Sequence, residues 1–306
     1  MGEVLVLGNG FDLSVGLKTA YIDFFNSKYW PFAGKKSSMA VYLNNRFNYE
    51  NWVDVEAALG DFATYPITGP QEVAEDEEDF DLLKKHFNKY ICNQQKTFTP
   101  NNDAYGARLL RAFIDDRGLM DYIFTFNFTD LSVVSRRLGI KRRFSYNHIH
   151  GRSTDGSAIL GVGDSVKLVP RLDFMYKSFS RFYSPPLIIP ALLEASRVII
   201  YGVSLGPVDY QYFDDFFTNM TNTNVEEPFS GSKEIIIITK NKDSRRDILR
   251  NLQQMTDFKL GRIASKHMFR VYCTCEKSDR RSLEKLIDDV QNRYEHYENI
   301  KSLRNH

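Results

Sequence analysis

Polar residues that could do chemistry follow four segments of strand-like sequence, each directly after the last apolar residue. They are Gly8, Asn9, Gly10 and Asp12; Asn127, Thr129 and Asp130; His148, His150 and Gly151; and Gly202, Ser204 and Asp209. Because the carboxyl ends of parallel strands lie along one edge of a sheet, we expect the four sets to meet in one crevice. Core packing does not need Asn and His at successive strand ends, so their coincidence indicates a binding or catalytic site.

Two of these residues have side chains suited to catalysis. The amide of Asn127 can hold a hydroxyl group or an attacking water without becoming charged. The imidazole of His150 can remove a proton from a hydroxyl or a water near neutral pH. Structural alternatives stay open: Asn127, Asp130 and Asp209 could cap helices, and His150 could be a turn residue. His148 would share a face with His150 on a strand, where packing is its expected role.

The Gly8-Asn9-Gly10 turn is a candidate phosphate site. Glycine lets the backbone approach a phosphate, and the following helix offers unpaired N–H groups to an anion. The turn lacks the third glycine of the dinucleotide fingerprint, and no acidic residue follows a second strand at the expected spacing. A tight turn that needs glycine for steric reasons alone is therefore an equal alternative.

The pattern of the chain predicts an α/β fold with a Rossmann-like parallel sheet flanked by helices. Expected helices at Asp209–Met220, Ser244–Met255 and Ser282–Asn299 alternate with strands. The first strand carries no charge, so we place it in the middle of the sheet. The expected strands are Val4–Leu7, Tyr122–Phe126, Phe144–His150, Ala158–Val162, Arg197–Tyr201, Glu234–Thr239 and Met268–Cys273.

One region departs from this alternation. Residues 29–119 show little strand pattern and contain helical stretches at Asp81–Gln95 and Asp103–Arg117. We interpret them as a helical insertion after the first strand, within a single α/β domain of residues 1–306. The segment Trp52–Glu56 is expected to cover part of the crevice, with Trp52 itself anchored in the core of the insertion.

Composition limits the class of protein. The 40 Lys and Arg residues nearly balance 39 Asp and Glu residues, so there is no strong nucleic-acid signal. Three cysteines form neither a disulfide framework nor a metal motif, which fits a reducing cytoplasm. A core strand at residues 4–7 leaves no room for a targeting segment, and no apolar run is long enough to span a membrane. We expect a cytoplasmic protein without a membrane partner.

The opening of the chain resembles the bacterial AbiH abortive-infection family of phage-defence proteins. The resemblance begins with Gly8-Asn9-Gly10-Phe11-Asp12-Leu13 and Gly16-Leu17-x-Thr19-x-Tyr21-x-Asp23-Phe24, and extends to about residue 217. Further blocks in the family's order are Trp52–Glu56, Phe126–Thr129, His148–Gly151 and Gly202–Gly206. The resemblance implies an anti-phage protein that arrests infected cells. Its expected partners are a nucleotide, an unidentified phage trigger, and either further copies of the chain or a partner defence protein.

The same blocks are more distantly similar to the sirtuin-like fold that binds nicotinamide adenine dinucleotide (NAD). This likeness implies that Asn127 contacts the ribose side and His150 is the catalytic histidine. It further implies that Gly8, Gly10, Gly202 and Ser204 hold the cofactor, although Asn9 replaces the alanine of the sirtuin turn. From their own positions, Asn9, Asp12 and Asp209 are also expected to contact the cofactor, Asp12 by bonding a ribose hydroxyl. The zinc-binding cysteine quartet of many sirtuin deacetylases is missing, so we expect no metal. The likeness therefore implies NAD cleavage, as by an NAD glycohydrolase, or NAD binding, in place of protein deacetylation.

Two other functions stay open. A metal-dependent phosphoesterase or nuclease could use His148 and His150 together with Asp12, Asp130 or Asp209 as ligands. A non-catalytic nucleotide-sensing module would bind the dinucleotide without consuming it. The metal content of the protein and product formation from NAD separate these alternatives.

Overall fold

A computed structural model of the protein describes residues 2–49, 54–64, 70–115, 121–183, 188–222 and 231–292. In these residues, six parallel strands form one sheet in the order β3-β2-β1-β4-β5-β6. The predicted parallel α/β fold is therefore confirmed. The order is that of doubly wound dinucleotide-binding sheets, in which the strand order reverses between β1 and β4. The strands are β1 (Glu3–Leu7), β2 (Tyr122–Thr125), β3 (Asn147–His148), β4 (Arg197–Tyr201), β5 (Glu234–Thr239) and β6 (Met268–Cys273).

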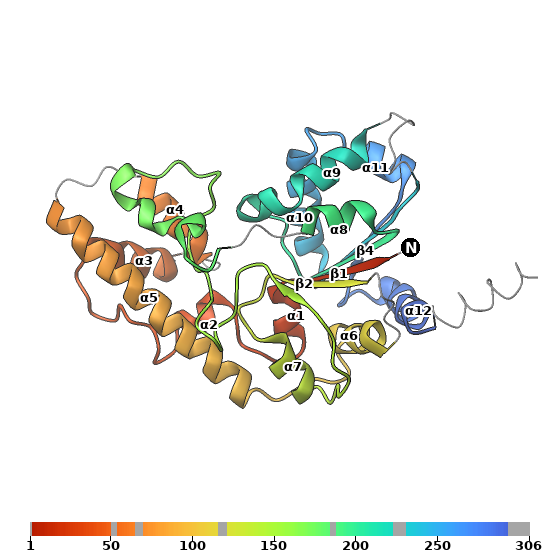
Figure 1. The fold of residues 1–306 in the computed structure, drawn as a ribbon, viewed down its shortest axis with the longest axis horizontal. Coiled ribbons are helices and arrows are strands. Elements are labelled where there is room, and N and C mark those ends of the chain that lie inside the picture. The colour runs from red at the N-terminus through yellow and green to blue at the C-terminus, as the bar shows by residue number, and fades with distance from the viewer. Residues whose placement is uncertain are drawn as a thin grey trace, which may run out of the picture.

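Strand β1 lies at the centre of the sheet because its apolar side chains are buried on both faces. Val4 and Val6 join one hydrophobic cluster, and Leu5 and Leu7 join the other, each at most 1% exposed. The first cluster is covered by α8 (Ile188–Glu194), α9 (Asp214–Thr221), α10 (Lys242–Met255) and α11 (Leu260–Lys266). The second is covered by α1 (Asn9–Ser14), α6 (Tyr105–Asp115), α7 (Leu131–Arg137) and α12 (Arg280–Gln291). Figure 1 shows these two helical layers on either side of the sheet.

A helical lobe lies beyond the carboxyl ends of the strands (Figure 1). Its own hydrophobic cluster is rich in aromatic side chains and includes Phe24, Trp30 and Phe87. The predicted helical stretch after the first strand is confirmed, although α6 packs under the sheet against α12 and lies outside this cluster. The helices of the lobe are α2 (Tyr21–Phe25), α3 (Ser38–Tyr49), α4 (Val55–Thr64) and α5 (Pro70–Thr97).

A second stretch of chain completes the lobe, and the sequence pattern did not reveal it. Leu160, Val162 and Met175 belong to the lobe's hydrophobic cluster. The expected strand Ala158–Val162 is wrong, because its apolar residues pack on the lobe and only Val162 makes an isolated bridge, to Tyr176. Short 3-10 helices follow at Pro170–Met175 (η1) and Lys177–Phe179 (η2). A run of apolar residues records burial but does not identify the surface against which the run is buried.

Several other boundaries differ from expectation. The strand expected at Phe144–His150 is reduced to the two residues of β3, and Asp209–Met220 divides into the 3-10 helix η3 (Pro207–Tyr212) and α9. Helix α10 begins earlier than predicted because Asn241, and not Ser244, is its N-cap. The last helix ends at Gln291, and residues 293–299 of the predicted helix lie outside the described residues. No helix in the described part of the chain is both long and apolar enough to cross a membrane.

The turns after β1 and β4 touch through their backbones. A Cβ atom on Gly202 would lie 2.6 Å from the Cα of Gly10, and a Cβ on Gly10 would lie 2.6 Å from the Cα of Gly202. The amide of Gly10 donates to the carbonyl of Gly202 at 2.9 Å, and that of Gly8 donates to the carbonyl of Tyr201 at 2.9 Å. Both amides are used inside the sheet, so these glycines have a steric reason to be there.

We predict that Gly202→Ala destabilises the fold much more than Gly156→Ala. Both glycines have a positive φ (69° and 73°), so alanine costs about 1–2 kcal/mol of backbone strain at either position. Only at Gly202 would the added Cβ overlap backbone atoms, at 2.6 Å, since no atom lies within 4 Å of a Cβ on Gly156. Overpacking should add about 1–3 kcal/mol. Urea unfolding of the two variants measures the difference, and equal losses of stability would contradict the steric account.

Candidate functional site

Asp12 and Asn127 form a buried hydrogen-bonded pair where β1 and β2 end. The Nδ2 of Asn127 donates to Asp12 Oδ1 at 2.8 Å, and the hydroxyl of Thr129 donates to Asp12 Oδ2 at 2.8 Å. Asp12 is 1% exposed and Asn127 5% exposed. Burial raises the pKa of Asp12 to about 7, although the hydrogen bonds from Thr129 and Asn127 act in the opposite direction. Asp12 therefore fixes which way the Asn127 amide faces.

This arrangement leaves one strong acceptor free. The Oδ1 of Asn127 is buried and has no hydrogen-bond partner among the described residues. An unpartnered buried amide oxygen is costly, about 1–3 kcal/mol, and is uncommon in native proteins unless a ligand or water satisfies it. Asn127 caps no helix, so the structural alternative for this residue does not apply. Its free oxygen can accept a hydrogen bond from a hydroxyl group or a water.

His150 lies in an aromatic cage after β3. Its ring contacts Phe126, Phe128 and Tyr212, with centroid distances of 5.5, 6.1 and 5.4 Å. The side chain is 5% exposed, and neither ring nitrogen has a hydrogen bond to a described residue. Burial, and then the charge of Lys177, lowers the pKa of His150 well below 6.5. The imidazole is therefore neutral at neutral pH, and it is a weaker base than the near-neutral histidine that the sequence predicted.

Asn127 and His150 are held by the same short segment. Phe126 and Phe128 turn their rings to His150, and the residues between and after them, Asn127 and Thr129, turn to Asp12. No hydrogen bond joins the Asn127 amide to the His150 ring. Their meeting in one crevice thus stays a prediction. His148 is oriented differently from His150: its Nδ1 lies 3.2 Å from the carbonyl of Asn127, and its ring contacts Tyr146.

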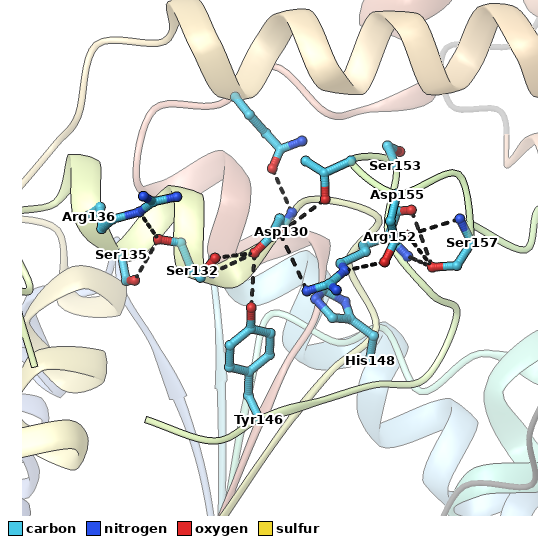
Figure 2. Close-up of polar contacts among 12 residues, drawn as sticks. Asp130, Ser132, Ser135, Arg136, Tyr146, His148, Arg152, Ser153, Asp155 and Ser157 are labelled. Atoms are coloured by element: carbon cyan, nitrogen blue, oxygen red, sulfur yellow. Dashed lines mark hydrogen bonds and ion pairs between the residues drawn. The ribbon is translucent and has the colours of Figure 1, made fainter. Parts of the chain in front are cut away.

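Asp130 is the centre of a polar network and the N-cap of α7, as one of the structural alternatives predicted. Figure 2 shows Ser132, Tyr146 and Arg152 converging on its carboxylate. Burial alone would raise the pKa of Asp130, but the hydrogen bonds from Ser132, Tyr146 and Thr154 outweigh it and lower the pKa. Beside the network is an open hollow of about 540 Å³. Its lining includes Tyr146, His148, Arg152, Asp155 and Ser157.

A buried ion pair joins α4 to η2, which belong to the two stretches of chain that form the helical lobe. The Nζ of Lys177 lies 2.8 Å from Glu56 Oε2, and the two side chains are 2% and 9% exposed. The amide of Gly161 donates to the other oxygen of Glu56 at 3.2 Å. Burial raises the pKa of Glu56 to about 7, with Lys177 acting against it. Nothing in the sequence marks Lys177, because a single lysine between Met175, Tyr176 and Phe179 forms no recognisable motif.

The remaining predicted residues surround these groups. Asp209 is half-buried and caps neither η3 nor α9; burial raises its pKa to about 6. Asn9 is exposed and hydrogen-bonded to Thr19, and the Ser204 side chain is exposed. Of the segment Trp52–Glu56, residues 52 and 53 lie outside the described residues, so the predicted position of Trp52 is not described. No three His, Cys, Asp or Glu side chains in the described ranges are placed to hold one metal ion.

Comparison with known proteins supports the resemblance seen in the sequence. A family model described as "Bacteriophage abortive infection AbiH" matches residues 4–230 of the 306-residue chain. The match covers β1 to β4, the helical lobe and every predicted site residue. No curated protein matches the chain. The more distant likeness to sirtuins stays a prediction.

The buried Asp12 predicts a specific dependence of stability on pH. Its folded pKa of about 7 lies above the usual 3.8, so its contribution to stability is complete below pH 3.8 and is lost as the pH rises through 7. The full change corresponds to roughly 4 kcal/mol. Asp12→Asn keeps the shape and removes the titration, so its stability relative to the natural protein should rise between pH 4 and 8. Urea unfolding across this range tests it; parallel curves would contradict the assignment.

The buried ion pair between Lys177 and Glu56 predicts a second effect on the stability of the fold. Lys177→Met leaves Glu56 buried without its partner and should cost about 3–5 kcal/mol at pH 8, where an isolated carboxylate is hardest to bury. Glu56→Gln combined with Lys177→Met should recover much of that loss. Arg250→Met is the matched control, because its pair with Asp247 is about 60% exposed on both sides and is worth about 1 kcal/mol at most. If the losses in unfolding free energy caused by Glu56→Gln and Lys177→Met simply added in the double variant, the energetic coupling between Glu56 and Lys177 would be excluded.

Proposed function

Because this chain belongs to the AbiH family of bacteriophage abortive infection proteins, we propose that it arrests infected cells by hydrolysing NAD. Its anti-phage role follows from the family; the chemistry is our inference from the site. The sheet order places a reversal point at the carboxyl ends of β1 and β4, where open α/β sheets bind ligands. The two candidate catalytic residues follow the neighbouring strands β2 and β3.

The observation that carries the proposal is the free oxygen of Asn127. The Asp12 carboxylate accepts a hydrogen bond from the amide nitrogen of Asn127. The Oδ1 of Asn127 is therefore left as a buried, uncharged hydrogen-bond acceptor. A ribose hydroxyl or a water poised for attack is a donor that would satisfy it. Asp12 is thereby a positioning residue, and its two oxygens are occupied by Asn127 and Thr129.

His150 supplies the proton acceptor. In hydrolysis, a water oxygen attacks C1′ of the nicotinamide-bearing ribose while the C1′–N bond breaks through an oxocarbenium-like state. The water proton passes to the neutral imidazole, and nicotinamide leaves with the electron pair of the broken bond. The products are nicotinamide and ADP-ribose. Burial in the aromatic cage keeps the imidazole unprotonated until that step.

The predicted cofactor residues differ in what they can offer a dinucleotide. Ser204 has an exposed side chain, and the carboxylate of Asp209 accepts no hydrogen bond from a described residue. These two are available for ribose hydroxyls or phosphate-bound water, whereas both amide atoms of Asn9 are engaged with Thr19. The amides of Gly8 and Gly10 are engaged with β4 and its turn, so other donors would have to hold the pyrophosphate. Gly202 supports the site through its close backbone contact with Gly10.

The metal-dependent alternative has less support from this geometry. Its ligand set requires His148 and His150 to face one ion, but the two rings contact different groups. Asp130 is also engaged by several donors as a helix cap. A binding module without catalysis is separated from an enzyme by whether NAD is consumed.

We predict that loss of either catalytic residue abolishes NAD hydrolysis by the activated protein. His150→Ala removes the proton acceptor and should lower the rate by roughly two to four orders of magnitude. Asn127→Ala removes the free acceptor, and Asn127→Asp tests whether orientation or neutrality matters. The measurement is NAD and ADP-ribose in extracts of phage-infected cells, by chromatography. His86→Ala in the helical lobe is the matched histidine control and should behave as the natural protein.

Several outcomes would contradict the proposal. Unchanged NAD in protected cells, with protection still lost in Asn127→Ala, would place the chemistry at this site but on another substrate. Activity that a chelator removes would favour a metal-dependent enzyme. Full protection by both alanine variants would exclude this site altogether.

A further inference from the structure

A second group of ionisable side chains lies where the helical lobe meets the sheet. We call it the carboxylate–tyrosine cluster: Tyr21, Asp54, Glu56, Lys177, Asp209 and Tyr212. Tyr21, Asp54 and Glu56 come from the lobe, and Asp209 and Tyr212 come from η3 after β4. The proposed hydrolysis assigns a role only to Asp209 among them.

Contacts along residues 161–163 connect the two halves of the cluster. Glu56 binds Lys177 and the amide of Gly161, and the amide of Lys177 donates to the carbonyl of Val162 at 2.9 Å. On the far side, a Cβ on Gly163 would lie 3.6 Å from the carbonyl oxygen of Val208, the residue before Asp209. The segment thus runs between α4 and η3 and places Glu56 and Asp209 on its two sides.

Negative charge exceeds positive charge in the cluster. The cluster holds three carboxyl groups, from Asp54, Glu56 and Asp209, and one ammonium group, from Lys177, which is in contact with Glu56. The repulsion between the carboxylates contributes to the pKa of Asp209. Burial, and then the charge of Asp54, raises this pKa, while the charge of Lys177 lowers it. Burial, followed by the charges of Glu56, Asp54 and Asp209, raises the pKa of Tyr21 well above its usual value. A cation bound here would relieve this repulsion.

Independent features indicate that a ligand belongs here. His150 is 5% exposed, has no hydrogen bond from its ring nitrogens to a described residue, and packs its ring against Tyr212 of the cluster at 5.4 Å. The carboxylate of Asp209 likewise lacks a described hydrogen-bond partner and caps no helix. Two polar groups without partners, one of them almost fully buried, therefore adjoin an excess of negative charge and two tyrosine rings.

We propose that the carboxylate–tyrosine cluster binds a planar organic cation, namely the pyridinium ring of oxidised NAD. The identity of that ligand rests on the proposed function. Tyrosine faces attract cations, and fixed carboxylates stabilise positive charge in a water-poor site. The same charges would favour the oxocarbenium-like state that forms when the C1′–N bond breaks. Because the departing nicotinamide is neutral, the attraction ends with the bond and favours product release.

The test compares two small molecules of nearly the same shape. 1-Methylnicotinamide carries the positive charge and nicotinamide does not, so their dissociation constants, measured by calorimetry on the full chain, isolate the effect of charge. We expect the cation to bind at least about tenfold more tightly at low salt. Asp209→Asn should bring the ratio of dissociation constants close to one while leaving nicotinamide binding unchanged.

Two further variants and a change of pH sharpen the test. Asp54→Asn keeps the oxygen that accepts from the amide of Glu56, so it should fold and also reduce the preference for the cation. Asp215→Asn removes the same charge from an exposed position on α9 and should leave the preference unchanged. Lowering the pH through 6 protonates Asp209 and should weaken cation binding to the natural protein.

Equal binding of both compounds, or of neither, would overturn this inference, as would an equal loss of preference in Asp215→Asn. The outcome is distinguishable from that of the proposed function. A protein that consumes NAD without preferring the cation keeps the hydrolysis and excludes the cluster as its cation site. A protein that prefers the cation but leaves NAD intact supports the cluster and excludes the hydrolysis.

Discussion

The close backbone contact between the turns after β1 and β4 is the constraint on which the rest of the site depends. Gly8 and Gly10 meet Gly202 at distances that leave no room for a side chain, and their amides complete hydrogen bonds with the neighbouring strand. Backbone atoms of the two turns therefore fill the space between the ends of β1 and β4, where the strand order reverses. A ligand at the carboxyl edge must therefore be held by groups beside the two turns, which come from the segments after β2 and β3, from η3 and from the lobe.

The segment Phe126–Thr129 distributes its side chains to two environments. Its aromatic rings form the cage around His150, and its polar side chains bind Asp12. An extended chain presents successive side chains in opposite directions, so Asn127 and the rings that contact His150 leave this segment on opposite sides. A ligand that reaches both Asn127 and His150 must therefore pass the edge of the segment. The segment lies between the buried sheet and the hydrophobic cluster of the lobe, where the ring of Phe128 packs against that of Phe87.

Three carboxyl groups with raised pKa values lie at this one edge of the protein. Asp12 comes from α1, Glu56 from the lobe and Asp209 from η3, and burial is the leading cause of the shift in each. Packing two helical layers on a sheet does not require any of them, and each reduces stability at neutral pH. Their grouping beside a neutral buried histidine is typical of functional sites, where environments rather than residue types assign the acid and base roles.

The sequence alone was sufficient to predict the parallel α/β fold, because apolar runs such as Val4–Leu7, Val198–Tyr201 and Ile235–Ile238 are strongly patterned and alternate with helices. It also marked Asp12, Asn127 and His150, since polar residues at strand ends stand out from that pattern. Only the three-dimensional structure shows that residues 160–175 complete the helical lobe, because an apolar run in the sequence does not identify the surface on which it packs. The structure also shows that Asp12 orients Asn127, which is 115 residues away in the chain. It further shows that Lys177 pairs with Glu56, which is 121 residues away. Such contacts depend on how separate elements come together, and local periodicity carries no record of that geometry.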